Sequence, residues 1–299
     1  MKINIFQYQS MLNAISSLIR FIRINSFDSP KSIETRTANR KAASNVIVSL
    51  TSTPSRIAKI APTLYSLIDQ SIKPSDIYIN IPEKYRDMDE YDIPNDITKL
   101  SLVTVKRIEK DLGPASKLLP ILKLSHIDPN TMIIILDDDQ IYSDKLIENY
   151  ITFEKVYPNS ALCLCGWRVP SNGKHNSRKS LRGSGVKIFQ PKPNIQQDEN
   201  IEILQGASSF MVKPRFFNAD VFDYSDAPKQ AFFVDDIWFS GHLARNGINK
   251  KVIKTKMPYG RMESVLSSTQ TGLVKTDNSV DNNNDALYEY FKQDWKLFD

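Results

Sequence analysis

The feature that most constrains the fold of this chain is an apolar run that leads directly into three aspartates. Residues Met132–Leu136 are all apolar, and Asp137–Asp139 follow without interruption. A short unbroken apolar run is typical of a strand that is buried on both faces of a parallel sheet. Because ligands of open α/β sheets bind at the carboxyl ends of the strands, we expect the three carboxylates at a functional edge. The alternative is a solvated acidic turn that leads to a helix N-cap at Ser143.

Segments with strand and helix patterns alternate around this run. Strands are predicted at 45–50, 76–81, 102–108 and 132–136. Apolar helical stripes lie between them, so the pattern predicts an α/β fold with a Rossmann-like, mostly parallel central sheet flanked by helices. Further strands are predicted at 161–169, 201–204, 208–212 and 251–256. A helix is predicted from Phe232 to Gly247, where the glycine is the C-cap residue.

The positive charge of the chain is concentrated at its N-terminus. The formal net charge is +5, and residues 1–41 contain seven basic residues against two acidic ones, so residues 42–299 are balanced. A nucleic-acid-binding protein would carry its excess charge on the folded body, and no nucleic acid partner is therefore expected. The remaining composition is that of an ordinary globular chain, which is long enough to bury a sizeable core.

An amphipathic helix is predicted within this basic segment. The residues that recur at helical spacing are Met11, Leu12, Ile15, Leu18, Ile19 and Ile22. The apolar run is too short to span a bilayer and no small-residue cleavage site follows it, so neither a spanning helix nor a cleaved signal peptide is expected. Three interpretations stay open: residues 1–23 lie on an anionic membrane surface, pack on the body of the protein, or pair in a dimer. Residues 25–43 are predicted to be a linker.

These patterns divide the chain into three parts. Residues 1–41 are the basic helix and linker, residues 42–261 are the main α/β domain, and residues 262–299 are a mobile loop with a C-terminal helix that completes the domain. The two cysteines, Cys163 and Cys165, have no further Cys or His cluster near them, which argues against a disulfide scaffold and a zinc site. The expected location is the cytoplasm, or the inner face of the cytoplasmic membrane if the N-terminal helix binds lipid.

Several segments resemble, in the same order, motifs of the GT-A glycosyltransferases. The first strand ends in the polar loop T-S-T-P-S-R, and T-L-Y-S-L-I-D-Q-S-I-K-P-S-D-I-Y-I is similar to the first helix and second strand of family 2-like enzymes. The aspartate triplet stands where that fold places its D-x-D motif, and D-D-I-W at 235–238 resembles the second acidic motif. L-G-P-A-S-K is similar to the segment before the D-x-D strand in some bacterial and exostosin-like transferases. The resemblance covers residues 45–260 and implies a GT-A catalytic domain at 42–261.

The resemblance implies a divalent metal site at the triplet. It assigns Asp139 as a direct ligand of Mn²⁺ or Mg²⁺, and Asp137 to the ribose or to a metal-bound water. It also places Asp138 at the nucleotide, without a specific role. Such an ion neutralises the charge that develops on a departing diphosphate. One or two protein carboxylates suffice to hold it, because phosphate oxygens and water complete its shell.

The second acidic pair, Asp235 and Asp236, is implied to lie on the acceptor side. In inverting relatives such an aspartate is the general base that takes the proton of the acceptor hydroxyl, and Asp236 is the predicted base. Asp235 is the second candidate, with a helix N-cap as its structural alternative. In the retaining exostosin-like enzymes the equivalent acid positions the substrate, and the sequence leaves these two chemistries open.

Six further residues are predicted to hold the nucleotide sugar. They are Thr51, Thr53, Arg56, Lys117, Gly206 and Arg261. The two threonines and Arg56 follow the first strand, where GT-A enzymes bind the nucleotide. The cations would pair with phosphate oxygens, and the glycine would let the sugar approach the backbone. Their structural alternatives are solvated surface positions and a tight turn.

The resemblance therefore predicts a metal-dependent glycosyltransferase. It would move a hexose or an N-acetylhexosamine from a nucleoside diphosphate sugar, with UDP favoured, to a hydroxyl of a surface glycan such as lipopolysaccharide, capsule or a lipid-linked glycan. One alternative is a sugar nucleotidyltransferase, which usually has a glycine-rich phosphate loop after the first strand, whereas Thr51–Arg56 contains no glycine. The other is a non-catalytic glycan-binding protein that has kept the fold, against which the two intact acidic motifs argue.

Overall fold

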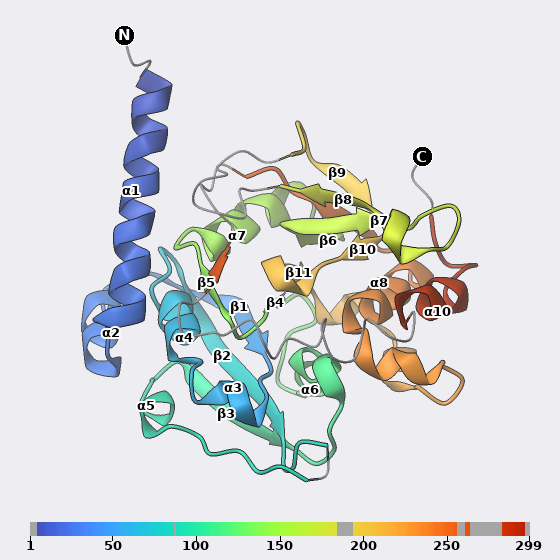
Figure 1. Cartoon of the computed structure of the whole chain (residues 1–299), viewed down its shortest axis with the longest axis horizontal. Coiled ribbons are helices and arrows are strands. Elements are labelled where there is room, and N and C mark those ends of the chain that lie inside the picture. Colours follow the sequence, from blue (N-terminus) through green and yellow to red (C-terminus); the bar gives the residue numbers. More distant parts are fainter. Residues whose placement is uncertain (1–4, 87, 184–193, 256–260, 264–282, 297–299) are drawn as a thin grey trace.

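The structure is a computed structural model that describes residues 5–86, 88–183, 194–255, 261–263 and 283–296. Within these ranges the side chains are described from residue 15 onward, except those of 261–263. A large, mostly parallel sheet runs through the centre of the molecule in the order β3-β2-β1-β4-β11-β6-β12-β9 (Figure 1). Its strands are β1 (Ala42–Leu50), β2 (Lys73–Pro82), β3 (Val103–Ile108), β4 (Met132–Ile135), β6 (Ser160–Cys163), β9 (Glu199–Ile201), β11 (Phe210–Val212) and β12 (Asn249–Val252). In this described sheet, β9 and β11 run opposite to the other strands.

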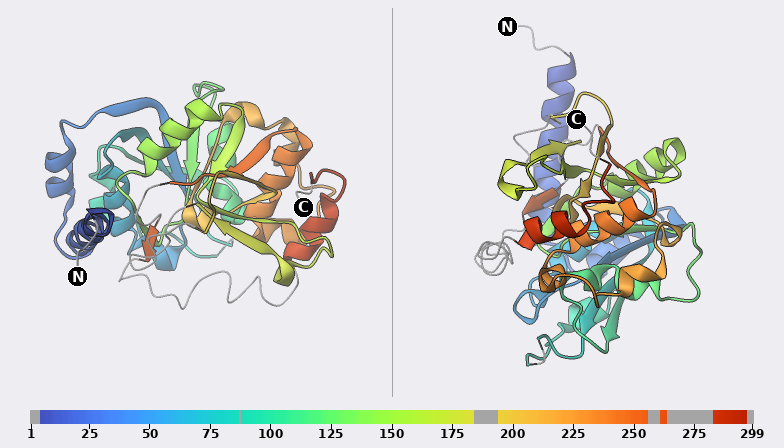
Figure 2. Two further views of the ribbon diagram at one scale, coloured as in Figure 1. Left: turned by 90° about the horizontal axis from the view of Figure 1, so that it is seen from above. Right: turned by 90° about the vertical axis from the view of Figure 1, so that its right-hand side faces the viewer.

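Helices cover both faces of the central sheet (Figures 1 and 2). The helices on one face are α1 (Ile5–Ser26), α2 (Pro30–Thr37), α4 (Ala61–Ile68) and α7 (Leu146–Val156), with the short helices α3 (Pro54–Ile57) and α5 (Asn95–Thr98). Those on the other face are α6 (Leu119–Leu122), α8 (Asp235–Arg245) and α10 (Asn283–Tyr290). The predicted α/β architecture with a mostly parallel, helix-flanked sheet is confirmed.

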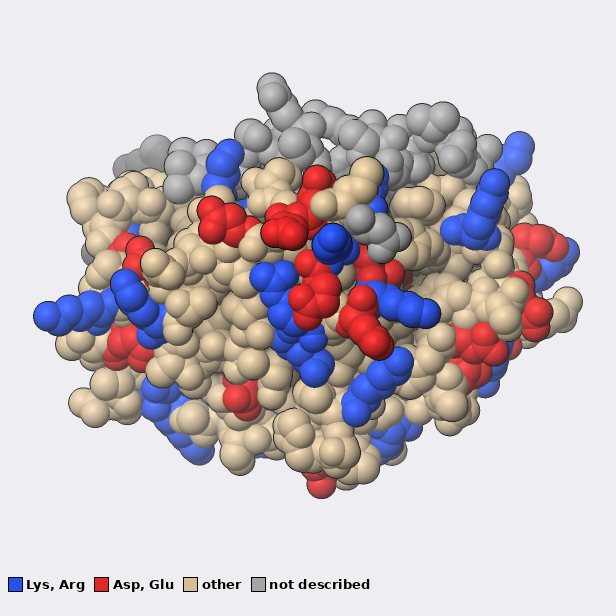
Figure 3. Space-filling view, turned by 90° about the horizontal axis from the view of Figure 1, so that it is seen from below, with Lys and Arg blue, Asp and Glu red and all other residues tan. Residues whose placement is uncertain are grey.

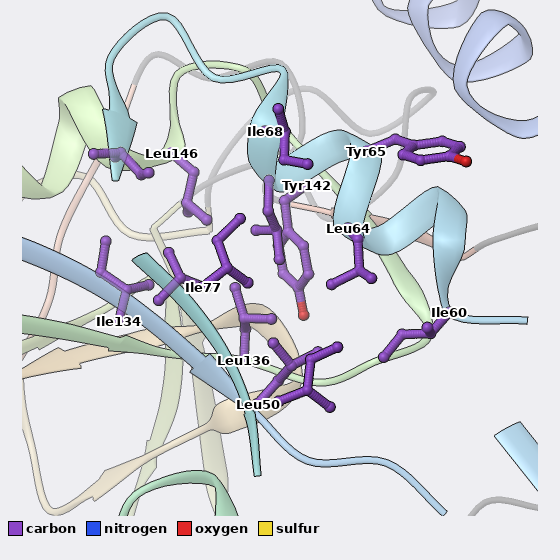
Figure 4. Packing of buried hydrophobic residues seen from close by; sticks show 14 of the residues in the cluster. Leu50, Ile60, Leu64, Tyr65, Ile68, Ile77, Ile134, Leu136, Tyr142 and Leu146 are labelled. Carbon is purple, nitrogen blue, oxygen red and sulfur yellow. The ribbon is translucent and has the colours of Figure 1, made fainter. Parts of the chain in front are cut away.

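The strand predicted at 132–136 is β4, and it is buried on both faces as the apolar run indicates. Ile134 and Leu136 belong to the hydrophobic cluster on one face of the sheet, whereas Ile133 and Ile135 belong to the cluster on the other. Figure 4 shows the first cluster, in which side chains from β1, β2, β4 and α4 lie against one another. Because each fully buried side chain of this size contributes about 1.5–3 kcal/mol, the strand that leads into the acids is firmly held.

Two predicted strands are each divided between two sheets. The segment 161–169 forms β6 in the main sheet and β7 (Cys165–Arg168) in a second sheet of order β10-β7-β8. The segment 201–204 is divided into β9 and β10 (Ile203–Leu204), and β8 is Lys179–Arg182. The prediction of single strands was wrong because both sheets are buried, so the apolar pattern continues where the chain changes sheet. Cys163 and Cys165 therefore stand in different sheets, and both are buried free thiols.

In the C-terminal third of the chain, the two predicted helices are present but begin and end at other residues than predicted. Helix α8 falls inside the predicted 232–247 segment, and Gly247 follows it with a φ of 71°, a left-handed conformation that favours glycine. The C-terminal helix, predicted at 287–295, is α10 and begins at Asn283. A short strand, β13 (Arg261–Glu263), pairs with β5 (Gln140–Tyr142) directly after the triplet. Residues 264–282 of the predicted mobile loop lie outside the described residues.

The predicted linker at 25–43 is in part a helix, α2, and an arginine cluster attaches this region to the main domain. The carboxylate of Asp69, at the end of α4, is almost completely buried and receives four guanidinium groups. Arg20, Arg23, Arg36 and Arg40 lie 2.9, 2.7, 3.3 and 2.8 Å from its oxygens. Burial alone would raise the pKa of Asp69, but the four arginines lower it below its ordinary value. The linker prediction failed because it rested on local composition, whereas these ion pairs are long-range.

Replacing Asp69 with asparagine is expected to lower the free energy of unfolding by about 2 kcal/mol, since hydrogen bonds to a charged group are lost. A carboxyl whose folded pKa is lowered stabilises the protein above its unfolded pKa, and the contribution is lost as pH falls through the folded pKa. The difference between wild type and Asp69→Asn should therefore shrink below the ordinary aspartate pKa of 3.8. Urea unfolding at several pH values measures it, with the exposed Asp226 as the matched Asp→Asn control. An equal stability of both proteins at neutral pH would contradict this assignment.

Candidate functional site

A cleft of ≈ 680 Å³ opens where the carboxyl ends of β1 and β4 face the N-terminus of α8. This volume is in the range of small-molecule binding sites. Six aspartates line it, against four arginine or lysine residues. Figure 3 shows acidic and basic side chains gathered near the centre of the face seen there. The cleft therefore contains acidic and basic side chains, with an excess of acidic ones.

The middle residue of the triplet, Asp138, holds the loop that follows β1. Its carboxylate is buried, accepts a hydrogen bond of 2.5 Å from Ser52 Oγ and pairs with the guanidinium of Arg56. Its carbonyl accepts from Thr63 Oγ1 at 2.8 Å. Burial raises the pKa of Asp138 to about 6, although Arg56 acts to lower it. These contacts give Asp138 a structural task that the sequence did not indicate: it joins the end of β4 to the 51–56 loop.

The two outer residues of the triplet present their carboxylates to the cleft. Asp139 is one-third exposed, lies 2.9 Å from Arg56 and accepts a hydrogen bond of 2.8 Å from Gln140 Nε2. Asp137 is similarly exposed and lies 2.9 Å from Lys117 Nζ. The hydroxyl of Tyr142 accepts from the backbone N–H of Asp137 and donates to its carbonyl, both at 3.0 Å. The backbone of the triplet is thus fixed while two carboxylates remain accessible.

Lys117 connects the triplet with the second acidic pair. Its ammonium is buried, and it lies 2.9 Å from Asp137 Oδ1 and 3.1 Å from Asp235 Oδ2. Burial acts to lower the pKa of Lys117, but Asp137, Asp235 and Asp236 together raise it well above its ordinary value. Lys117 is therefore charged at neutral pH, and it partly neutralises acids from two elements that are far apart in the sequence.

Asp235 and Asp236 form the first turn of α8 and face the cleft. The N-cap residue of this helix is Val234, so Asp235 does not cap it and that alternative is excluded. Asp236 Oδ1 accepts a hydrogen bond of 3.0 Å from the backbone N–H of Gly206. Burial, then the neighbouring Asp235, raises the pKa of Asp236 well above its ordinary value. The raised pKa makes Asp236 a stronger base when it is ionised.

Gly206 allows this close approach because it has no side chain. A Cβ at this position would lie 3.0 Å from Asp236 Oδ1 and 3.1 Å from Lys117 Nζ, which is tighter than ordinary packing. The prediction that this glycine serves a close approach agrees with the structure, but the groups that approach it are two side chains of the site. The predicted approach of a sugar to Gly206 stays a prediction.

Most of the other predicted residues also reach the cleft. Thr51, Thr53, Arg56 and Lys117 all line it. Thr51 Oγ1 donates to the carbonyl of Asn80 at 2.7 Å, so its hydroxyl is already engaged. The backbone of Arg261 lies in β13 opposite Tyr142, but the side chain of Arg261 lies outside the described part of the chain.

Two further residues that were not predicted from the sequence, Ser52 and Tyr142, shape the site. Ser52 lies inside the T-S-T-P-S-R loop, and Tyr142 follows the aspartate triplet by three residues. Neither had a signal of its own, because a serine or a tyrosine next to charged residues is common on protein surfaces. Their roles follow from hydrogen bonds to Asp138 and Asp137 that only the folded chain creates.

The residues at the end of β4 fit a divalent ion that takes part of its shell from a ligand. Among the described residues, no group of three or more His, Cys, Asp or Glu side chains is arranged to hold a metal on its own. Asp137 and Asp139 nevertheless offer hard carboxylate oxygens at the cleft surface. Mg²⁺ and similar ions bind through one or two carboxylates together with phosphate oxygens and water. The donor set therefore suits an ion that arrives with a phosphate ligand.

Comparison of the chain with protein-family models and with curated proteins finds no match.

Proposed function

We propose that this chain is a metal-dependent glycosyltransferase of the GT-A type, which moves a sugar from a nucleoside diphosphate sugar to a hydroxyl of a glycan acceptor. UDP is the expected nucleotide, and a surface glycan or a lipid-linked glycan is the expected acceptor. The observation that carries the proposal is the position of Lys117, which lies within 3.1 Å of acids from both motifs. The two acidic motifs therefore share one cleft, as a reaction between a donor and an acceptor requires.

The charge of the cleft supports a role for a divalent cation. Its lining carries more aspartates than basic residues, so a diphosphate entering alone would meet net repulsion. Mn²⁺ or Mg²⁺, held by Asp139 and Asp137, would supply the positive charge that stabilises the departing diphosphate. Arg56, which already lies beside Asp139, is placed to pair with a phosphate oxygen through its planar guanidinium. Thr51 and Thr53 also line the cleft, and in this proposal they contact the nucleotide.

The acceptor side is assigned to Asp235 and Asp236. In the proposed step the acceptor oxygen forms a bond to the anomeric carbon, and the bond from that carbon to the diphosphate oxygen breaks. Asp236 takes the proton from the acceptor hydroxyl, and the electron pair of the broken bond leaves with the diphosphate. Gly206 holds Asp236 through its backbone N–H, and Lys117 holds Asp235. This assignment implies inversion at the anomeric carbon, and a product of retained configuration would reassign Asp236 to positioning of the substrate.

Release of UDP from a panel of UDP-sugars tests the proposal. The purified chain is expected to release UDP with Mn²⁺ or Mg²⁺ and to lose this activity with EDTA. Without an acceptor the release should be slow, because it reports only hydrolysis of the donor. A suitable glycan acceptor should make it faster. Formation of a nucleotide sugar and pyrophosphate from a sugar phosphate and UTP would instead identify a nucleotidyltransferase. Glycan binding without turnover of any nucleotide sugar would identify a binding protein.

The rate of transfer is expected to rise with pH through the pKa of Asp236, which lies well above the ordinary aspartate value of 3.8. A general base accepts a proton only in its ionised form, so the rate falls on the acidic side of this pKa. Asp236→Asn should lower kcat/KM about 10²–10⁴-fold and remove the acidic limb. The measurement is UDP release across a pH series, with Asp226→Asn as the control. A variant that keeps the wild-type rate would contradict the role of Asp236.

A further inference from the structure

Helix α1 has two different faces along its C-terminal half. One face packs on the main domain through Ile24, which is buried, and through Arg20, which donates to Asp69 and to the carbonyl of Tyr142. Figure 1 shows the N-terminal half of α1 rising past α2 and α4, and the view from above in Figure 2 places the helix at a corner of the molecule. The helix is therefore attached at its C-terminal end and extends beyond the domain.

The face of α1 that turns away from the domain carries a row of exposed aliphatic side chains. Ile15, Leu18, Ile19 and Ile22 are 47%, 40%, 60% and 46% exposed. Their spacing of three and four residues places them along one side of a helix. They make up most of the large hydrophobic residues that the described part of the chain leaves exposed. Single exposed apolar residues are normal, but a contiguous row marks an interaction surface.

We propose that this row lies on a lipid surface, and that it binds by insertion of apolar side chains and not by attraction to anionic headgroups. Residues 3–19 contain no charged residue, and the polar positions in this stretch are Asn, Gln and Ser. The two arginines that follow, Arg20 and Arg23, are both bonded to Asp69. Helices whose polar face lacks basic residues bind membranes chiefly through their buried apolar area. The expectation of an anionic surface rested on the seven basic residues of 1–41, and the structure pairs the four arginines among them with Asp69.

A second copy of this chain is the competing occupant, and the charge pattern argues against it. Paired helices with a repeat of three and four residues carry charged residues beside the apolar seam, which set the partner and the orientation. In α1 the residues between Ile15 and Leu18 are the uncharged Ser16 and Ser17, and charge is absent from residues 3–19. A lipid surface needs no such pairing, because the membrane interior accepts any apolar row of suitable width.

Attachment of α1 to lipid would also hold the cleft in a defined position. Arg20 Nη1 donates to the carbonyl of Tyr142 at 2.7 Å, and the hydroxyl of the same tyrosine bonds both backbone groups of Asp137. The lipid-binding helix and the acidic triplet are therefore connected through one residue.

Flotation of the full-length protein with vesicles tests the proposal without any need for activity. Wild-type protein should float with vesicles of phosphatidylcholine alone, and added phosphatidylglycerol or added salt should change the bound fraction less than about twofold. The double variant Ile15→Ser/Ile19→Ser should lose at least about tenfold in binding. The matched control is Met88→Ser/Val156→Ser, which removes two apolar side chains elsewhere that are more exposed than Ile15 and Ile19, and should bind as wild type does. Circular dichroism and thermal unfolding confirm that both variants are folded.

Three outcomes would overturn the inference. Wild-type protein that remains unbound with every vesicle composition excludes a lipid surface. Binding that requires phosphatidylglycerol and disappears in salt would show that charge, and not apolar insertion, drives association. A wild-type dimer in light scattering that becomes a monomer in the Ile15→Ser/Ile19→Ser variant, without vesicle binding, would assign the row to a second copy of the chain.

Discussion

Asp139→Ala is expected to lower metal-dependent UDP release at least about 10²–10³-fold, which is the loss seen when one group that stabilises developing charge is removed. Asp139 is the carboxylate of the triplet that the proposal assigns directly to the metal, and it is one-third exposed at the cleft. Its salt bridge to Arg56 is partly solvated, so the free energy of unfolding should change by less than about 1 kcal/mol. Activity and stability are therefore expected to separate in this variant.

The control for this variant is Asp226→Ala, which removes an exposed carboxylate that does not line the cleft. It should keep the wild-type rate. A Mn²⁺ titration adds a second readout, because loss of one metal ligand should raise the ion concentration that gives half-maximal activity. Full activity of Asp139→Ala at the same Mn²⁺ concentration would show that Asp139 is not a metal ligand. An equal loss of activity in Asp226→Ala would point to a general effect of charge.

Lys117→Met is expected to lower the free energy of unfolding by about 3–5 kcal/mol near neutral pH, which is the usual effect of removing one partner from a buried ion pair. Lys117 is buried between Asp137 and Asp235. Without its charge, these carboxylates and Asp236 repel one another in a site of low dielectric constant. The methionine keeps most of the apolar stem, so the change reports mainly on the lost ammonium group.

The effect of Lys117→Met should grow with pH. Asp236 already has a raised pKa in the folded wild type, and removal of the cation raises it further. A carboxyl with a raised folded pKa binds more protons in the folded state than in the unfolded state, so stability falls as pH rises from 3.8 through that pKa. Urea unfolding at about pH 5 and about pH 8 measures the difference.

The control, Lys59→Met, removes an exposed lysine and should change stability by less than about 0.5 kcal/mol at both pH values. A loss for Lys117→Met that is smaller at about pH 8 than at about pH 5 would contradict this account.

The fold could be predicted well where the signal is local. The apolar run before the triplet predicts β4 because a strand buried on both faces needs no polar residue. The first strands and the presence of helix α8 follow from similar short-range patterns, although α8 begins three residues after the predicted start. The divided segments at 161–169 and 201–204 show the limit of this reasoning. A strand that passes from one buried sheet to another keeps its apolar composition, so the sequence has no mark at the change.

The site could be predicted as a set of residues, but their partners could not. Thr51, Thr53, Arg56, Lys117 and the acids of both motifs were named from the sequence, and all of them line one cleft. That Arg56 joins Asp138 and Asp139 depends on contacts across more than eighty residues of chain. No spacing rule reports such a contact, because its geometry is created by the sheet.

The sequence by itself determined that an apolar strand delivers three carboxylates to the edge of an α/β sheet, and that a helix later in the chain carries two more near its N-terminus. Both statements depend on hydrophobic periodicity and helix ends, which are properties of neighbouring residues. The tertiary structure alone decided which carboxylates face the cleft, that Asp138 is occupied by Ser52 and Arg56, and that Lys117 lies between the two motifs. It also decided that the N-terminal arginines bind Asp69 and leave an uncharged apolar row exposed. Charge pairing and desolvation depend on distance in space, and only the folded chain sets those distances.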